Sequence, residues 1–202
     1  MRRYRSAFAV ATLAVTLVAS CTADKTGDAR PTGSTTSAPQ PSTESAAPGV
    51  ATPLTTDRYE QSPCDGLTQD QIDRFLGTGV SPEPDLNAPG GPACNWHTSD
   101  GSGASIGIGF VAKGLSRIYG GKGSAFAFFQ PLGTIQGYPA VAYGVNDDRM
   151  TSGSCTVAVG TSDNSTIDVG ATIRRQNIGK KDPCDAAYQV AQTIIDNIKR
   201  GS

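Results

Sequence analysis

The sequence predicts an α+β fold, in which an antiparallel sheet built from hairpins carries N- and C-terminal helices on one face and is held by two disulfides. Three observations support this prediction. Two helical patterns lie at the ends of the region after residue 56, segments of alternating apolar residues lie between them, and four cysteines are spread over the same region. A run of strands bounded by helices is typical of an antiparallel sheet with helices packed on it.

The first 20 residues have the pattern of an export signal. Three arginines precede an apolar run over residues 7–18, which is shorter than the ~20 residues that span a bilayer. The run ends in Ala19-Ser20 directly before Cys21, as in a bacterial lipobox. We therefore expect removal of residues 1–20, acylation of Cys21, and anchoring of the protein in the cell membrane on the extracytoplasmic side. The alternative is an ordinary signal peptide followed by an incidental cysteine.

Residues 21–56 have the composition of a disordered stalk. They are rich in Ser, Thr, Pro, Ala and Gly and show no apolar periodicity, so they have nothing to bury in a core. Proline keeps such a segment extended. We expect the stalk to hold a folded domain, residues 57–202, away from the membrane.

The N-terminal helix is predicted to begin after Thr68. Gln71 follows three residues later and completes a capping box, and Gly77 ends the helix. The C-terminal helix follows Asp182-Pro183, a cap and a proline at the first helical position. Its apolar side chains recur with helical spacing and form one stripe, at Ala187, Val190, Ala191, Ile194, Ile195 and Ile198.

Two hairpins are predicted between the helices. Residues 93–97 and 105–110 alternate around the turn at 99–103, and residues 155–159 and 167–173 alternate around the turn at 163–165. The intervening chain has weaker signals. Residues 113–123 allow a helical turn or two, residues 134–143 read as one strand interrupted at Gly137 and Pro139, and residues 80–92 read as turns.

The four cysteines that remain after lipidation of Cys21 predict two disulfides, as in other exported domains. Three pairings are possible. We predict Cys64–Cys94 and Cys155–Cys184, since each pair then joins a helix start to a strand within one half of the chain. Both helix starts carry the same tripeptide, Pro-Cys-Asp.

Composition and motifs argue against several functions. The net charge is −1, so no electrostatic case exists for nucleic acid. His97 is the one histidine and is predicted to be a surface residue, so neither a catalytic triad nor a zinc site is expected. The glycine-rich segment 120–124 lacks the Lys-Ser/Thr order of a phosphate loop. We expect no catalytic residue, no metal and no cofactor.

Three functions therefore stay open. The first is a binding or sensing module for an envelope, lipid or protein partner, and the second is a structural or accessory lipoprotein without a small ligand. The third is an enzyme using carboxylates such as Asp65, Asp147 or Asp148, which we do not favour because no spacing marks an acid–base pair. For an apolar or amphipathic ligand, the candidate binding residues are aromatic, and their alternative role is to complete the core: Phe126, Phe128, Phe129, Tyr138 and Tyr143.

The chain also carries a combination of motifs, namely Pro63-Cys64-Asp65-Gly66-Leu67-Thr68, Cys94-Asn95-Trp96, Gly137-Tyr138-Pro139-Ala140-Val141, Cys155 and Pro183-Cys184. Over residues 57–200 this combination resembles a family of actinobacterial lipoproteins that carry a domain of unknown function. The resemblance implies a cell-envelope lipoprotein with no established activity. More loosely, the layout is similar to the extracellular sensor domains of some mycobacterial receptor kinases.

Overall fold

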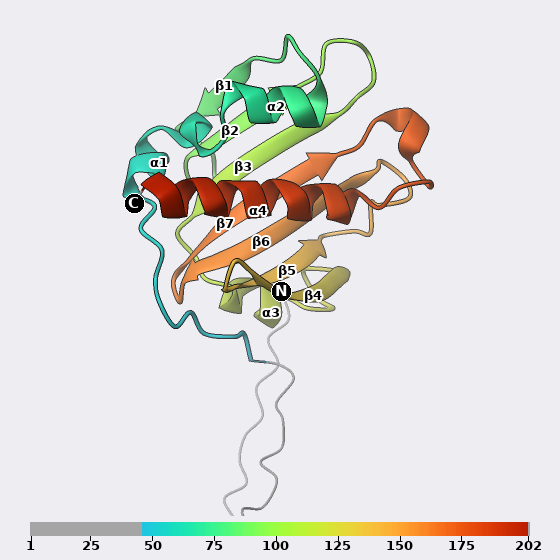
Figure 1. The fold of residues 1–202 in the computed structure, drawn as a ribbon. Helices are drawn as coiled ribbons and strands as arrows, with labels where there is room; N and C mark the ends of the chain where they lie inside the picture. The colour runs from blue at the N-terminus through green and yellow to red at the C-terminus, as the bar shows by residue number, and fades with distance from the viewer. Residues whose placement is uncertain (1–45, 202) are drawn as a thin grey trace, which may run out of the picture. The chain divides into compact units, whose positions relative to one another are not determined.

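The computed structural model describes residues 46–201, in which seven strands form one antiparallel sheet with the order β1-β2-β3-β7-β6-β5-β4 (Figure 1). The strands are β1 (Pro82–Asp85), β2 (Ala93–His97), β3 (Ser105–Val111), β4 (Phe128–Ile135), β5 (Tyr138–Gly144), β6 (Ser154–Ser162) and β7 (Ser165–Thr172). The α-helices are α1 (Asp57–Gln61), α2 (Gln69–Leu76), α3 (Ser116–Gly120) and α4 (Pro183–Gly201). Two 3₁₀ turns, η1 (Pro63–Gly66) and η2 (Arg175–Asn177), complete the fold.

Helix α4 crosses the sheet over β6 and β7 (Figure 1). It begins as predicted, because Asp182 Oδ1 accepts a hydrogen bond of 2.8 Å from the backbone N–H of Cys184 and Pro183 occupies the first helical position. The apolar stripe is buried against the sheet, with Ile194 and Ile198 both fully inaccessible to solvent. Most of the stabilisation of α4 therefore comes from packing of this stripe.

Helix α2 packs on the same face, so the predicted arrangement of the two helices is confirmed. Its capping box is formed, since Thr68 and Gln71 each accept a hydrogen bond from the backbone of the other. Gln71 then exchanges amide hydrogen bonds of 2.8 and 3.0 Å with Asn197 of α4. Because Gln71 is 8% exposed, this polar pair is largely shielded from water and fixes α2 relative to α4.

The two predicted hairpins form the middle of the sheet. Strands β2 and β3 pair around one turn, β6 and β7 pair around the other, and β3 joins the hairpins by pairing with β7. In the β3–β7 register Ile108 lies opposite Val169, and both side chains are buried on the helix face. Alternation along each strand thus puts one apolar row under the helices.

Both disulfides have the predicted partners. Cys64 of η1 is bonded to Cys94 of β2, and Cys155 of β6 is bonded to Cys184 in the first turn of α4. Each bridge joins the start of a helical segment to a strand on the helix face. They fix the η1 segment and the N-terminal end of α4 to the sheet independently of each other.

Two predictions about the weaker segments are wrong. Residues 134–143 are not one interrupted strand but belong to the β4–β5 hairpin, because Gln136 and Gly137 have φ angles of 53° and 92° and form its two-residue turn. Within the predicted turns at 80–92, residues 82–85 form the exposed edge strand β1. Pro82 and Pro84 hid it from sequence reasoning, because proline within a strand is confined to edges and bulges.

The opposite face of the sheet is only partly covered. Helix α3, in the region predicted to hold a helical turn or two, packs Leu115 and Ile118 against Val141 and Ala158 in a second, smaller apolar cluster. The outward positions of β3 and β7 beside it are small or polar, as at Gly107, Gly109, Asp168 and Gly170, and they are half-buried.

Residues 46–56, the last part of the predicted stalk, lie against the domain. Leu54 is buried, and its N–H donates a 2.8 Å hydrogen bond to the carbonyl of Thr161.

Cys21 and the leader 1–20 lie outside the described residues. Both apolar clusters and both disulfides lie within the described residues 46–201, so the core and the cross-links of the domain are formed by this part of the chain alone. Among residues 46–201, none of the helices combines the length and hydrophobicity needed to cross a bilayer.

Candidate functional site

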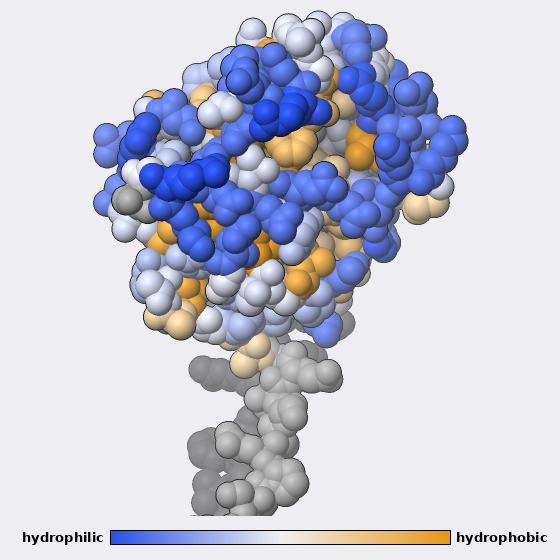
Figure 2. Space-filling model, in the orientation of Figure 1, coloured by the Kyte–Doolittle hydropathy of each residue, from blue (hydrophilic) through white to orange (hydrophobic). Residues whose placement is uncertain are grey.

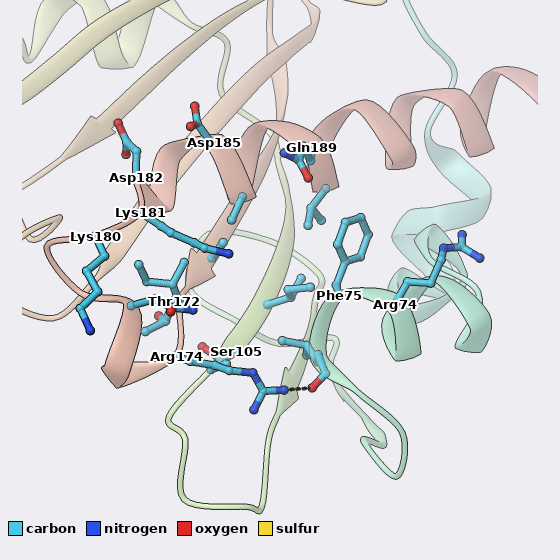
Figure 3. Close-up of a pocket in the computed structure, with 18 residues that line it drawn as sticks. Arg74, Phe75, Ser105, Thr172, Arg174, Lys180, Lys181, Asp182, Asp185 and Gln189 are labelled. Atoms are coloured by element: carbon cyan, nitrogen blue, oxygen red, sulfur yellow. Dashed lines mark hydrogen bonds between the residues drawn. The ribbon is translucent and has the colours of Figure 1, made fainter.

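A cavity of about 670 Å³ opens between α2 and the N-terminal half of α4 (Figure 3). The start of β3 and the end of β7 form its floor, and the loop that contains η2 forms a third wall. This volume falls within the ~300–1,000 Å³ of small-molecule sites in proteins. We refer to it below as the α2–α4 cavity.

The lining of the α2–α4 cavity is apolar at its base and charged at its rim. Figure 2 shows apolar surface at the bottom of a hollow between the two helices, bordered by hydrophilic residues. The apolar side chains come from both helices, both strands and the adjoining loops: Phe75, Leu76, Ala104, Ile106, Ala171, Ile173, Ala186 and Val190.

Phe75 is the one aromatic side chain that lines this cavity. On α2, Ile72 and Leu76 turn into the core and are at most 5% exposed, whereas Phe75 lies further round the helix and stays half-buried. In Figure 3 its ring points across the opening toward Gln189 of α4. A ligand in the cavity would therefore contact the ring.

Arg174 holds the cavity wall in place. Its Nη2 donates a 2.6 Å hydrogen bond to the carbonyl of Leu76 at the end of α2, and its Nη1 donates one of 2.8 Å to Asp100. The first bond satisfies a helix-terminal carbonyl. Hydrogen bonds from Ser102 and from Arg174 lower the pKa of Asp100 well below its usual range, so this carboxylate stays ionised. Both terminal nitrogens of the Arg174 guanidinium thus donate hydrogen bonds within the protein.

The other charged side chains at the rim point in different directions. Figure 3 shows Lys181 extending into the cavity, whereas the carboxylates of Asp182 and Asp185 point away from it. Asp182 is also occupied, because it caps α4 and lies 4.0 Å from Arg149. The side chain of Lys181 makes no hydrogen bond or ion pair with the described residues. The mouth of the cavity therefore carries the positive charge of Lys181 at this end.

The five aromatic residues predicted as a ligand site lie elsewhere, and the structure divides them between two apolar clusters. Phe128 belongs to the main core, with the Arg149 guanidinium 4.2 Å above its ring, and Tyr138 packs at the margin of that core. Phe126, Phe129 and Tyr143 pack with the second cluster on the opposite face. Edge-to-face pairs with centroids 4.9 Å apart join Phe126 to Tyr143 and Tyr119 to Phe129. None of the five lines the α2–α4 cavity.

His97 and the three candidate carboxylates are exposed. His97 Nδ1 lies 3.5 Å from Glu83 of the neighbouring edge strand, and both side chains are more than half exposed. Asp147 pairs with Arg149 at 2.8 Å, Asp148 organises the turn that follows it, and Asp65 lies in η1. Within residues 46–201, no group of three or more His, Cys, Asp or Glu side chains is arranged to hold a metal ion.

Asp168 is an acidic side chain held under the second cluster. It accepts hydrogen bonds of 2.6 Å from the Tyr143 hydroxyl, 2.7 Å from Thr166 and 3.0 Å from Arg117. Burial, together with the charge of Asp168, raises the pKa of Tyr143 above its ordinary value. Three donors on one carboxylate make this a structural network that ties α3 and β5 to β7.

Sequence reasoning missed the residues that shape the cavity. Phe75 fits the apolar stripe of α2 and carries no separate signal, and Arg174 acts through a contact with a carbonyl 98 positions earlier in the chain. The Lys180-Lys181 pair directly before the helix cap was the one local sign. Two adjacent lysines directly before a helix whose first turn is buried indicate that positive charges lie near the end of the sheet where this helix begins.

Comparison with known protein families matches residues 16–197 to one family, described as protein of unknown function (DUF3558). No curated protein matches the chain. No solved structure matches it either. Since the match covers most of the sequence, the chain belongs to the DUF3558 family of proteins of unknown function.

Proposed function

We propose that this protein is a lipid-anchored binding protein of the cell envelope, whose folded domain holds an amphipathic ligand in the α2–α4 cavity and does no chemistry on it. The observation that carries the proposal is the cavity, with its apolar base, its charged rim and a volume of about 670 Å³. Ligand sites are concave and combine apolar surface with polar groups that fix the orientation of the ligand.

The lipobox supports the anchoring. A basic head, a short apolar run and two small residues before Cys21 occur together at the N-terminus. The two disulfides fit the same location, since they persist in oxidising compartments outside the cytosol. Residues 22–45 would then act as the tether between the acylated cysteine and the domain.

The placement of the acidic groups favours binding over catalysis. Asp65, Asp147 and Asp148 are exposed and do not line the α2–α4 cavity. Asp168 is saturated by three donors, and the carboxylates nearest the cavity point away from it (Figure 3). An acid–base mechanism needs a titratable group within reach of the ligand, and here the closest such group is Lys181.

Native mass spectrometry tests the binding proposal. The domain is isolated, under mild conditions, from the envelope of the organism that makes it, and we expect a bound small molecule. Phe75→Ala should lose this molecule, because the ring forms one side of the cavity. Phe129→Ala removes an equally half-buried ring from the opposite face and should keep it. If wild-type protein carries no ligand, the accessory role without a small ligand becomes the better account.

Metabolic labelling tests the anchor. Cells that express the full chain are given a palmitate analogue, and the protein is captured. Wild type should be labelled and Cys21→Ala should not, because no sulfur is then available for the lipid. Equal labelling of the two would overturn the anchoring proposal and leave the ordinary signal peptide in its place.

A further inference from the structure

We infer that the ligand of the α2–α4 cavity is an amphipathic anion, with its negative head group bound by Lys181 and its apolar part on the surface formed by Phe75 and the strand floor. This inference rests on the proposed function, since it assigns the chemistry of the ligand that the cavity is proposed to hold. It follows from which charges face the cavity and which do not.

Of the two lysines that line the cavity, Lys180 points away from the opening in Figure 3, and Lys181 is the cation at its mouth. Figure 3 shows its side chain extending toward the middle of the opening, whereas Arg74 points away from it. Arg174 lines the same cavity, but its guanidinium already donates to Leu76 and Asp100. Lys181 is an exposed residue at the mouth of the cavity and makes no hydrogen bond or ion pair with the described residues, so a negative group brought there gains a charge-assisted hydrogen bond from its ammonium.

No acidic side chain already fills this role. Asp182 and Asp185 belong to the same cavity wall, but their carboxylates are directed to the far side of α4 (Figure 3). Asp182 accepts the capping hydrogen bond from Cys184 and lies near Arg149. An anion near Lys181 would therefore meet a net positive end of the cavity.

The ammonium of Lys181 and the ring of Phe75 lie apart from each other in the cavity. Lys181 and Thr172 lie at one end, and Phe75 lies at the other (Figure 3). A ligand that satisfies both ends must have a charged part and an apolar part at a distance from each other. A small inorganic anion would leave the apolar end unfilled, and a plain hydrocarbon would leave Lys181 unpaired.

The cavity also opens away from the start of the domain. In Figure 1 the first described residues lie at the lower side of the view, and the space between α2 and the N-terminal end of α4 lies at the upper right. The described residues 46–56 do not line the cavity.

Titration calorimetry on the compact unit, residues 42–202, tests the inference. The probes are decyl phosphate, decanol, decyltrimethylammonium and inorganic phosphate, each kept below the concentration at which micelles form. We expect decyl phosphate to bind most tightly, decanol more weakly, and the cation and inorganic phosphate not measurably. Lys181→Gln should weaken decyl phosphate about tenfold, the effect of one charge-assisted hydrogen bond. The affinity of the Lys181→Gln variant for decanol should equal that of wild type.

Two further variants complete the test. Lys181→Arg keeps the charge and should retain most of the affinity for decyl phosphate. Lys113→Gln removes the same charge from an exposed position in the loop before α3, and should bind like wild type. These controls distinguish the effect of a positive charge at position 181 on affinity from the effect of the domain's net charge.

The outcomes distinguish the two proposals. If none of the decyl probes binds, both the cavity as a ligand site and the inference are wrong. If the decyl probes bind with equal affinity whatever their head group, and Lys181→Gln changes nothing, the binding role stands and the anionic head group is wrong. Tight binding of inorganic phosphate alone would replace the amphipathic anion with a small anion.

Discussion

The two faces of the sheet differ in what covers them. On the helix face, α2 and α4 bury a continuous apolar core, and both disulfides end there. On the opposite face, α3 covers part of β5 and β6 with a small cluster, and the outward positions of β3 and β7 stay small, polar and half-buried. Stability and the α2–α4 cavity thus come from the same face, and the cavity lies where the two helices of that face separate.

This difference shows how a chain of modest hydrophobic content forms a stable domain. Most of the buried large apolar side chains of residues 46–201 belong to the main core under α2 and α4. The chain places them on one face and uses glycine, serine and threonine on much of the other. Substitutions on the two faces should therefore have unequal costs.

The largest effect is expected from a truncation in the main core. Ile194→Ala on α4 removes a fully buried side chain and should lower the free energy of unfolding by about 4 kcal/mol, the cost of lost burial plus a cavity. Ile118→Ala on α3 is equally buried but lies in the small cluster, where the surroundings can collapse, and should cost about 2 kcal/mol. Urea unfolding measures the free energy of unfolding of both variants. Equal losses would contradict the expectation that substitutions cost more on the helix face than on the opposite face.

Removal of one disulfide should cost slightly less. The double substitution of Cys155 and Cys184 by alanine should lower stability by about 3 kcal/mol, because the bridge closes a loop with a sequence separation of 29. The matching substitution of Cys64 and Cys94 opens a loop of nearly the same length, with a separation of 30. Thermal unfolding of both variants should therefore give similar losses, and a large difference would show that native contacts, rather than loop length, dominate.

On the opposite face, Tyr143→Phe should cost about 2 kcal/mol at neutral pH, since it removes a hydrogen bond to a charged carboxylate. The substitution should also change the response to alkali. The pKa of Tyr143 is raised in the folded state, so the stability that depends on its protonated form is complete below pH ~10, the unfolded pKa, and is lost as the pH rises through the folded value.

Wild type should therefore lose stability above pH ~10 more steeply than Tyr143→Phe. Tyr188→Phe is the control, because the hydroxyl of Tyr188 makes no hydrogen bond with the described residues. It should leave stability at pH 7 unchanged. Parallel pH profiles for wild type and Tyr143→Phe would show that the tyrosine does not titrate as proposed.

The smallest effect is expected at His97. It contacts Glu83 at 3.5 Å, but both side chains are more than half exposed, and exposed ion pairs contribute little. His97→Gln should therefore change the free energy of unfolding by less than ~0.5 kcal/mol at pH 5 as well as at pH 8. A clear loss confined to pH 5 would assign the imidazolium a structural role.

The elements that the sequence predicts well are those with local signals. The cap at Thr68, the cap and proline before Cys184, and the alternating residues of the two central hairpins each mark their own boundaries. The disulfide pairing followed from where those elements begin. Strand β1 and the β4–β5 turn were missed, because prolines and a Gln-Gly pair interrupt the apolar alternation there.

The cavity could not be predicted in the same way. Its walls come from segments around residues 75, 105, 172, 181 and 189, which meet only when the sheet and both helices are assembled. Phe75 has the signal of a core residue, and Lys181 has that of a surface residue. The residues of the predicted aromatic site are close in the sequence but are separated in the structure. Strand alternation places Phe128 and Phe129 on opposite faces of the sheet.

Prolines at the two free edges of the sheet affect how copies of the domain can associate with one another. Strand β1 contains Pro82 and Pro84, and strand β4 contains Pro131, where the pairing register shifts. Proline has no N–H to donate, so neither edge presents an unbroken row of donors to another strand. Edge-to-edge pairing between copies of the domain needs such a row of donors. Edges of this kind keep neighbouring copies from polymerising into one extended sheet.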